Sequence, residues 1–328
     1  MNVRRQAYLK KRPHRSFRRT RRRDYARSLQ LPGYIAFTAQ VNRTIKAHRR
    51  TFGLLVVLYA AIMLILGGVT SQDVYTQISD MLHASGGDAA NGGLSAIGQA
   101  GLLLVSTFAS GPGNLTADQQ IYLGFALLLV WLATVWLHRE FMLGRRPRLR
   151  DGLYNSGAPV VSTLAIMLVL VAQLFPIGIV ALAYAGLSSV GLVDSGFGSM
   201  LFWVFAAIVS ALVLYWITST IISLVVVTLP GMYPLQALKA SGDLVVGRRL
   251  RIAYRLLWGQ LVVLVTWLII FVPLILVDTW LASVWKWFDN VPLLPVIAAI
   301  ASSASVVWLA SYVYLLYRKV VEDDAKPA

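Results

Sequence analysis

The sequence predicts an all-α fold, a polytopic membrane bundle of six transmembrane helices with amphipathic elbow helices on its cytoplasmic side. Composition is the first reason: 57% of the 328 residues are hydrophobic and only 13% are charged, whereas ordinary soluble domains have about 25% charged residues. The second reason is a series of charge-free apolar runs, since a helix needs roughly 20 residues to cross the hydrocarbon core. The runs are 52–70, 121–137, 159–187, 199–228, 256–277 and 292–317.

The N-terminal segment divides into a tail and a helix. Residues 1–30 are dense in arginine and poor in apolar residues, which predicts a disordered tail. Between residues 31 and 50, apolar side chains then recur at helical spacings of three, four and four. They are Tyr34, Phe37, Val41 and Ile45. We therefore expect an amphipathic juxtamembrane helix that lies in the headgroup plane.

Charge predicts the topology of the six-helix domain, residues 51–317. Residues 1–50 contain 16 Lys and Arg and a single acid. If this segment is cytoplasmic, alternate loops and the tail 318–328 are cytoplasmic too, and 29 of the 30 basic residues lie on that side. Such a bias is the positive-inside pattern, so both termini are predicted to be cytoplasmic. The loop 71–120 then lies outside, where we expect a helix that rests on the outer leaflet.

The polar segment 233–250 separates two predicted spans and predicts an interfacial elbow helix. Pro234 suits the first turn, because its missing N–H would have no partner there. Gly247 suits the left-handed residue that ends a helix. One predicted face carries Leu235, Leu238, Gly242 and Val245, with Gly242 allowing close packing, and Gln236, Lys239 and Asp243 face away.

Three pairs of neighbouring arginines precede predicted spans, and we expect them to contact lipid phosphates. The pairs are Arg49 and Arg50, Arg145 and Arg146, and Arg248 and Arg249. Their spacings of 96 and 103 residues suggest three units, each an elbow followed by a helical hairpin. Basic pairs before helices also arise for topology alone, and that alternative stays open.

Polar residues inside the predicted spans are few, and none of them is ionisable. They form a possible mid-membrane cluster of Gln173, Thr218, Ser219, Thr220, Ser223 and Gln260. Small and hydroxylated residues promote close helix packing, which we place ahead of a substrate site. Pro176 and Pro273 lie late in the third and fifth spans, and bent helices there keep a substrate path open.

The sequence contains no pattern typical of an enzyme. It has no cysteine and only four histidines, none in a His-Glu-x-x-His arrangement. We therefore predict no catalytic residue, no metal site and no cofactor.

Part of the elbow resembles a bacterial membrane-domain family. Ala237, Leu238, Ser241, Leu244 and Gly247 match an Ala-Leu, a Ser and a Leu-x-x-Gly that precede a basic entry into the next helix. The stretch is similar to the membrane domain of some glycerophosphoryl diester phosphodiesterases and to YciC-like inner-membrane proteins. The resemblance implies a helical module of a bacterial inner membrane, without the catalytic domain. Near the end of the same helix, Asp243 is predicted to pair with an arginine, because a negative charge is unfavourable there.

These observations favour a non-enzymatic membrane module that associates with envelope lipids, through anionic headgroups, or with a protein partner whose identity is unknown. One alternative is a subunit of a transporter or channel for an uncharged or lipid-like substrate. Another is a tether to the ribosome or to nucleic acid through residues 1–30.

Overall fold

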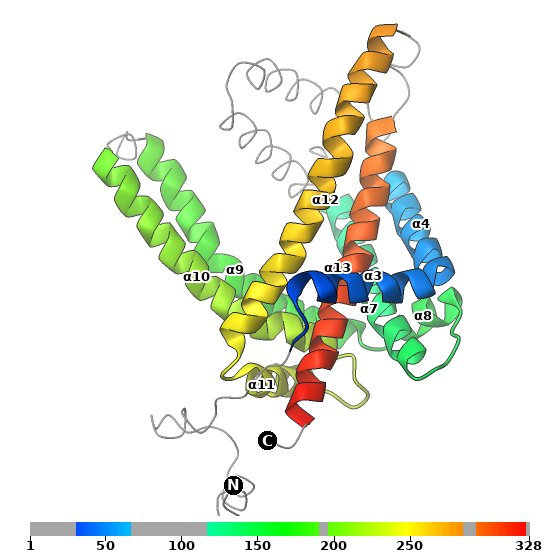
Figure 1. Ribbon diagram of the computed structural model, residues 1–328. Coiled ribbons are helices and arrows are strands. Elements are labelled where there is room, and N and C mark those ends of the chain that lie inside the picture. Colours follow the sequence, from blue (N-terminus) through cyan, green and yellow to red (C-terminus); the bar gives the residue numbers. More distant parts are fainter. Residues whose placement is uncertain (1–30, 67–116, 190–195, 285–292, 326–328) are drawn as a thin grey trace, which may run out of the picture. The chain divides into compact units, whose positions relative to one another are not determined.

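The computed structural model describes residues 31–66, 117–189, 196–284 and 293–325 (Figure 1). Throughout these residues the regular secondary structure is helical, which confirms the predicted all-α class. The helices are α3 (Tyr34–Ala47), α4 (Arg49–Leu66), α7 (Ala117–Met142), α8 (Leu149–Ser156), α9 (Val160–Ser189), α10 (Gly196–Val226), α11 (Pro234–Val245), α12 (Arg249–Val284) and α13 (Leu293–Ala325). The predicted tail 1–30 and nearly all of the outer loop 71–120 lie outside the described residues.

Six of these helices are long and apolar enough to cross a membrane, as the sequence predicted. They are α4, α7, α9, α10, α12 and α13. A helix is the natural solution for such a segment, because it satisfies each backbone N–H and C=O group internally. The chain is therefore a multi-pass membrane protein.

The helices continue past the apolar runs at their polar ends. α7 extends to Met142 and includes His138, whereas the predicted span ended at Leu137. α12 begins at Arg249 and includes Arg255, whereas the predicted span began at Leu256. The apolar runs themselves contain no charged residue or histidine, and His138 and Arg255 lie on helical turns just beyond them. An apolar run in the sequence ends at the first charged residue. The helix itself can continue past that residue when its side chain has a hydrogen-bond partner.

Among the described residues, three short helices are each followed by two long helices, which is the order of elbow and hairpin that the sequence suggested. α3 precedes α4 and α7, α8 precedes α9 and α10, and α11 precedes α12 and α13. The arginine pairs do not mark equivalent points in this order. Two pairs lie where an elbow meets a span, but Arg145 and Arg146 precede the elbow α8 itself.

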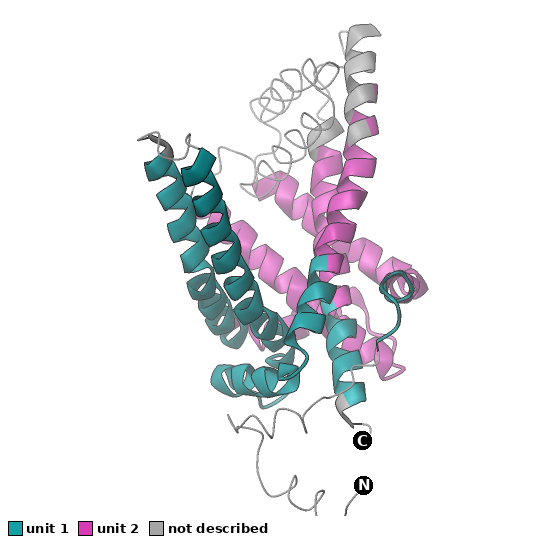
Figure 2. Ribbon diagram, turned by 60° about the vertical axis from the view of Figure 1, so that its left-hand side comes forward, with its two compact units in different colours: residues 1–37, 161–257, 313–328 teal, residues 38–160, 258–312 magenta. Residues whose placement is uncertain are grey.

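The helices group into two compact units that do not coincide with the three predicted hairpins (Figure 2). Unit 1 contains residues 1–37, 161–257 and 313–328, and unit 2 contains residues 38–160 and 258–312. The helices α3, α12 and α13 each contribute residues to both units.

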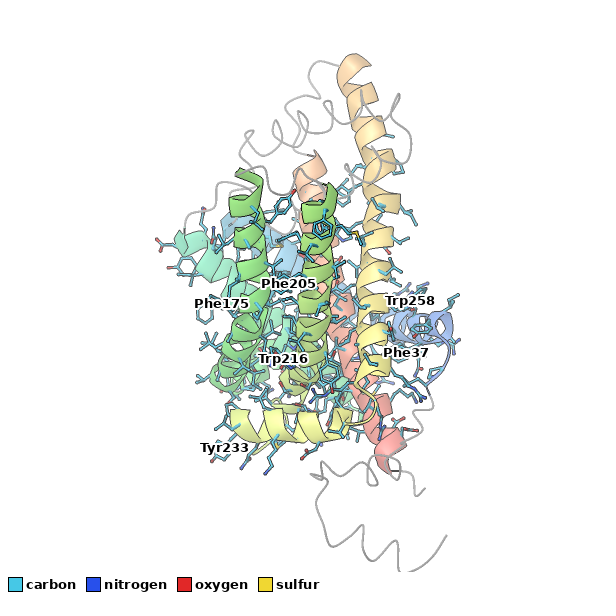
Figure 3. All side chains as sticks on the ribbon, turned by 90° about the vertical axis from the view of Figure 1, so that its left-hand side faces the viewer. Phe37, Phe175, Phe205, Trp216, Tyr233 and Trp258 are labelled. Carbon is cyan, nitrogen blue, oxygen red and sulfur yellow. The ribbon has the colours of Figure 1, made fainter. Side chains whose placement is uncertain are left out.

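In unit 1, α9 and α10 run side by side as a hairpin, and the elbow α11 packs against α10 (Figures 1 and 2). Few side chains of α9 are buried, Thr163 and Ile166 among them. Phe175 on α9 and Phe205 on α10 are exposed, as Figure 3 shows. Apolar exposure on this scale is the normal surface of a helix in lipid, where burial is not needed to remove apolar groups from water.

In unit 2, α4 packs against both α7 and α8. The core of this packing combines aromatic and aliphatic side chains from α4, α7 and α13. Its buried members are Phe52, Leu55, Tyr59, Ala126, Val130, Ala133, Leu137 and Val307. Leu149 and Leu153 of α8 pack against the same cluster.

The elbow α11 starts and ends as the sequence predicted, but its buried face differs. Pro234 lies in the first turn, and Gly247, with φ of 79°, follows the helix in the left-handed conformation. The buried side chains are Ala237, Ser241 and Val245, and Leu235 is 80% exposed. Small residues at spacings of four allow α11 to approach its neighbour closely, and the bulky Leu235 stays at the surface.

Close packing at glycine occurs at two other positions, not at Gly242. A Cβ atom added to Gly242 would meet nothing within 4 Å. One added to Gly152 of α8 would lie 3.0 Å from the Leu137 side chain. One added to Gly259 of α12 would lie 3.1 Å from the ring of Tyr312, which is fully buried. Gly152 and Gly259 therefore let elements of unit 2 approach each other.

We expect Gly259→Ala and Gly242→Ala to change stability in opposite directions. Gly259→Ala should destabilise by about 1–3 kcal/mol, because the new methyl group overpacks a buried ring. Gly242→Ala should stabilise by up to about 1 kcal/mol, because alanine favours a helix interior more than glycine does. Thermal unfolding of the purified protein in detergent measures both. A shift in the same direction for both variants would contradict the packing described for Gly259.

Candidate functional site

The predicted mid-membrane cluster is only partly brought together by the structure. Within unit 1, the Thr220 hydroxyl donates a hydrogen bond of 2.8 Å to the side-chain oxygen of Gln173, which joins α10 to α9. Thr218, Thr220 and Ser223 are buried. Gln260 lies on the part of α12 that belongs to unit 2, and its side chain is exposed.

Most hydroxyl groups of this cluster donate hydrogen bonds to backbone carbonyls of their own helix. Thr218 donates to the carbonyl oxygen of Leu214 at 2.7 Å, and Ser223 donates to that of Thr220 at 2.6 Å. Ser219 donates to the carbonyl of Trp216 at 3.0 Å. Their protons are therefore used within α10, which suits helix packing better than recognition of a substrate.

Arg248 forms a buried ion pair with Asp323 in unit 1. Its Nη1 atom lies 3.0 Å from Asp323 Oδ2, and the two side chains are 1% and 8% exposed. The same nitrogen lies 3.5 Å from the carbonyl oxygen of Val320. The prediction that Arg248 contacts lipid phosphate therefore fails on geometry, because its guanidinium group is enclosed by the end of α13. The pair links the junction between α11 and α12 to the C-terminal turns of the chain.

The predicted pairing of Asp243 with an arginine is not found among the described residues. The acid that pairs with an arginine of the elbow is Asp323, which is 75 residues away from Arg248 in sequence.

Arg255 is also buried, and it holds the residues that lead into α3. Its Nη2 atom donates a hydrogen bond to the Pro32 carbonyl. The centre of its guanidinium group lies 4.1 Å from the ring centroid of Tyr34, a cation–π contact. Arg249 makes a similar contact, 4.7 Å from the ring centroid of Tyr215 on α10. These arginines therefore serve contacts inside unit 1.

A buried histidine contacts a serine in unit 2. His138 Nε2 lies 2.7 Å from Ser311 Oγ, and both side chains are fully buried. Ser311 donates its proton to the carbonyl of Val307 at 2.7 Å, so the His138 nitrogen is the donor to Ser311. A serine nucleophile needs the opposite arrangement, in which the histidine accepts the serine proton. The contact is therefore a structural link between α7 and α13.

The remaining predicted phosphate contacts lie at the surface of unit 2. Arg49, Arg50, Arg145 and Arg146 are all exposed. Arg145 forms an ion pair of 2.9 Å with Glu140 while its side chain stays 69% exposed. These four residues have the exposure that a headgroup contact requires, and that role stays a prediction.

No protein-family model matches the chain, and no curated protein or solved structure matches it. The resemblance of the elbow to the phosphodiesterase membrane domain stays a prediction, and so does a location in a bacterial inner membrane.

Sequence reasoning missed three functional or structural contacts: the Arg248–Asp323 pair, the Arg255 contacts and the His138–Ser311 bond. Only the second carries a sequence signal, since an arginine within a helical continuation of an apolar run needs a partner. The other two depend on which helix ends meet.

We expect the Arg248–Asp323 pair to stabilise the fold. Arg248→Met leaves a buried carboxylate without its cation, and the loss should be about 3–5 kcal/mol. The double variant Arg248→Met/Asp323→Leu should lose much less than the sum of the single variants, because no charge is left buried. Thermal unfolding in detergent measures this cycle.

The exposed pair of Arg318 with Glu322, 3.4 Å apart, is the matched control. Arg318→Gln should cost no more than about 1 kcal/mol. Equal losses of stability for Arg248→Met and Arg318→Gln would show that burial of the Arg248–Asp323 pair does not add to its contribution to stability.

Proposed function

We propose that this protein is a non-enzymatic multi-pass membrane module that binds anionic lipid headgroups through its elbow regions. The observation that carries the proposal is the division between its arginines. Arg248 and Arg255 are enclosed by protein contacts, whereas the pairs 49/50 and 145/146 are exposed at the ends of apolar helices. Exposed basic residues at that position attract anionic lipid by about 1 kcal/mol each.

The charge asymmetry supports a cytoplasmic location for the elbows and both termini. The 29 basic residues that fall on one side in the six-span topology follow the positive-inside bias. On this orientation the elbows meet the anionic cytoplasmic leaflet. The resemblance of the elbow supports a bacterial inner membrane.

A transporter or channel subunit is the second candidate. It is favoured by the Gln173–Thr220 hydrogen bond, which joins α9 to α10, and by Pro176 three residues after Gln173. A proline in a spanning helix frees a backbone carbonyl that a substrate or ion can use. The tether through residues 1–30 stays a prediction, since those residues lie outside the described part of the chain.

Native mass spectrometry of the protein, purified gently from membranes, tests the proposal. We expect retained anionic phospholipid, and a higher affinity for phosphatidylglycerol than for phosphatidylcholine when each is added back after delipidation. Equal affinity for the two lipids would contradict the proposal. A stoichiometric protein in the spectrum would replace it with the role of a subunit. Solute flux in liposomes that Gln173→Leu abolishes would favour the transporter.

A further inference from the structure

A stacked pair of rings brings two arginine pairs to the same end of unit 2. His48 directly precedes Arg49, and Phe141 lies four residues before Arg145. The His48 and Phe141 rings stack with centroids 3.7 Å apart and planes 9° from parallel. The pairs 49/50 and 145/146, which are 96 residues apart in sequence, are therefore neighbours in the fold.

The elements around this stack are held firmly. The Phe52 ring contacts both His138, at 4.7 Å, and Phe141, at 5.7 Å between centroids. Leu149 of α8 packs on the same core, which fixes the chain just beyond Arg146.

The helix α3 is held by hydrogen bonds to two other helices. The Trp258 indole donates to the Thr38 hydroxyl at 3.1 Å, and the Trp308 indole donates to the Asn42 side-chain oxygen at 2.7 Å. These bonds tie α3 to α12 and α13, and α3 crosses in front of α13 in Figure 1. The basic residues thus sit on a preorganised frame, which lowers the entropic cost of binding a ligand.

The charge at this end of unit 2 is strongly positive. Nine cations lie within residues 43–50 and 139–150: Arg43, Lys46, Arg49, Arg50, Arg139, Arg145, Arg146, Arg148 and Arg150. Two carboxylates accompany them. Glu140 pairs with Arg145 at 2.9 Å, and Asp151 accepts the backbone N–H of Arg148 at 3.0 Å. Burial lowers the pKa of His48 below its usual value, so the positive charge at neutral pH comes from the other groups.

An apolar stripe leads from Arg50 into the membrane along α4. Leu54, Val57, Ala61 and Ile65 follow Arg50 at spacings of four, three, four and four, which place them on one helix face. All are exposed, with Leu54, Val57 and Ile65 at 58%, 62% and 78%. A single face of α4 therefore offers Arg50 at its end and an apolar surface beyond it.

We propose that this end of unit 2 binds a phospholipid with two phosphate groups, one at each arginine pair, with an acyl chain along the exposed face of α4. Guanidinium groups bind phosphate through two parallel hydrogen bonds, so a pair of arginines suits one phosphate. The stripe favours a lipid over a soluble polyanion or an acidic protein, because neither of those would cover Leu54 and Val57. The inference rests on the proposed function and specifies the lipid class.

Native mass spectrometry of the full chain in detergent, titrated with tetraoleoyl cardiolipin or dioleoyl phosphatidylglycerol, tests the proposal. We expect the wild type to prefer the two-phosphate lipid by at least about tenfold. Arg49→Gln/Arg50→Gln and Arg145→Gln/Arg146→Gln should each lower its affinity by about 30-fold, the loss expected for two cations at a membrane surface. Each double variant should then bind both lipids about equally.

The matched control is Lys239→Gln/Arg251→Gln, which removes two exposed positive charges from unit 1. This variant should keep the preference of the wild type. Equal losses in the control and in the other two variants would overturn the site, because charge alone would then explain binding. A thermal unfolding scan of each variant confirms that its fold is retained.

Three further outcomes distinguish failure of the two-phosphate site from failure of the proposed function. A wild type that binds both anionic lipids equally overturns the two-phosphate site and leaves the proposed function intact. A wild type that binds neither overturns both. Pyrophosphate that binds as tightly as the two-phosphate lipid would overturn the lipid assignment, because it has the charge without the acyl chains.

Discussion

The helices of this protein depend on one constraint, that polar groups within an apolar medium must find partners inside the protein. The backbone meets it by helix formation alone. Several hydroxyl side chains in the spanning helices meet it within their own helix, by donating to a carbonyl one turn earlier. Thr134 donates to Val130, Thr266 to Val262 and Ser303 to Ala299, each at 2.7 Å. Once these bonds are made, the side chain has no free proton to donate and presents a small, nearly apolar surface. Such residues therefore suit close contacts between helices.

The constraint is more demanding for charges, and it separates two uses of arginine in one chain. A guanidinium group that is enclosed needs an acceptor of matching geometry, and Arg248 and Arg255 have a carboxylate and a carbonyl oxygen, respectively. A guanidinium group at the surface can instead take its acceptor from the surroundings. Arg49 and Arg248 differ in tertiary context, although both lie where an elbow meets an apolar helix. Whether such an arginine forms an ion pair inside the protein or stays exposed therefore depends on which part of the fold lies next to it.

Helix number and type could be predicted from the sequence because apolar length and backbone satisfaction are local properties. The limits of α11 could be predicted for the same reason, since Pro234 and Gly247 act on their own backbone. Its buried face could not, because Leu235 is exposed and Ser241 is buried. The buried face of such a short elbow depends on the neighbouring helix against which it packs, and its own sequence does not specify that neighbour. Gly242 and Gly259 both lie inside helices, and only Gly259 is a close contact because the ring of Tyr312 lies opposite it.

The arginine pairs show where local reasoning and tertiary structure must be combined. The positive-inside bias predicts basic residues on one side of the spans, and it predicts them equally well if each pair stands alone. It does not require that two pairs meet, nor that the residues between them form a packed frame. In unit 2 they do meet, since His48 and Phe141 stack beside them and Phe52 supports both the stack and the core. A topology signal needs only net charge, whereas recognition of a defined headgroup needs charges at fixed positions, and the packed junction of α3, α4 and α7 supplies that additional property.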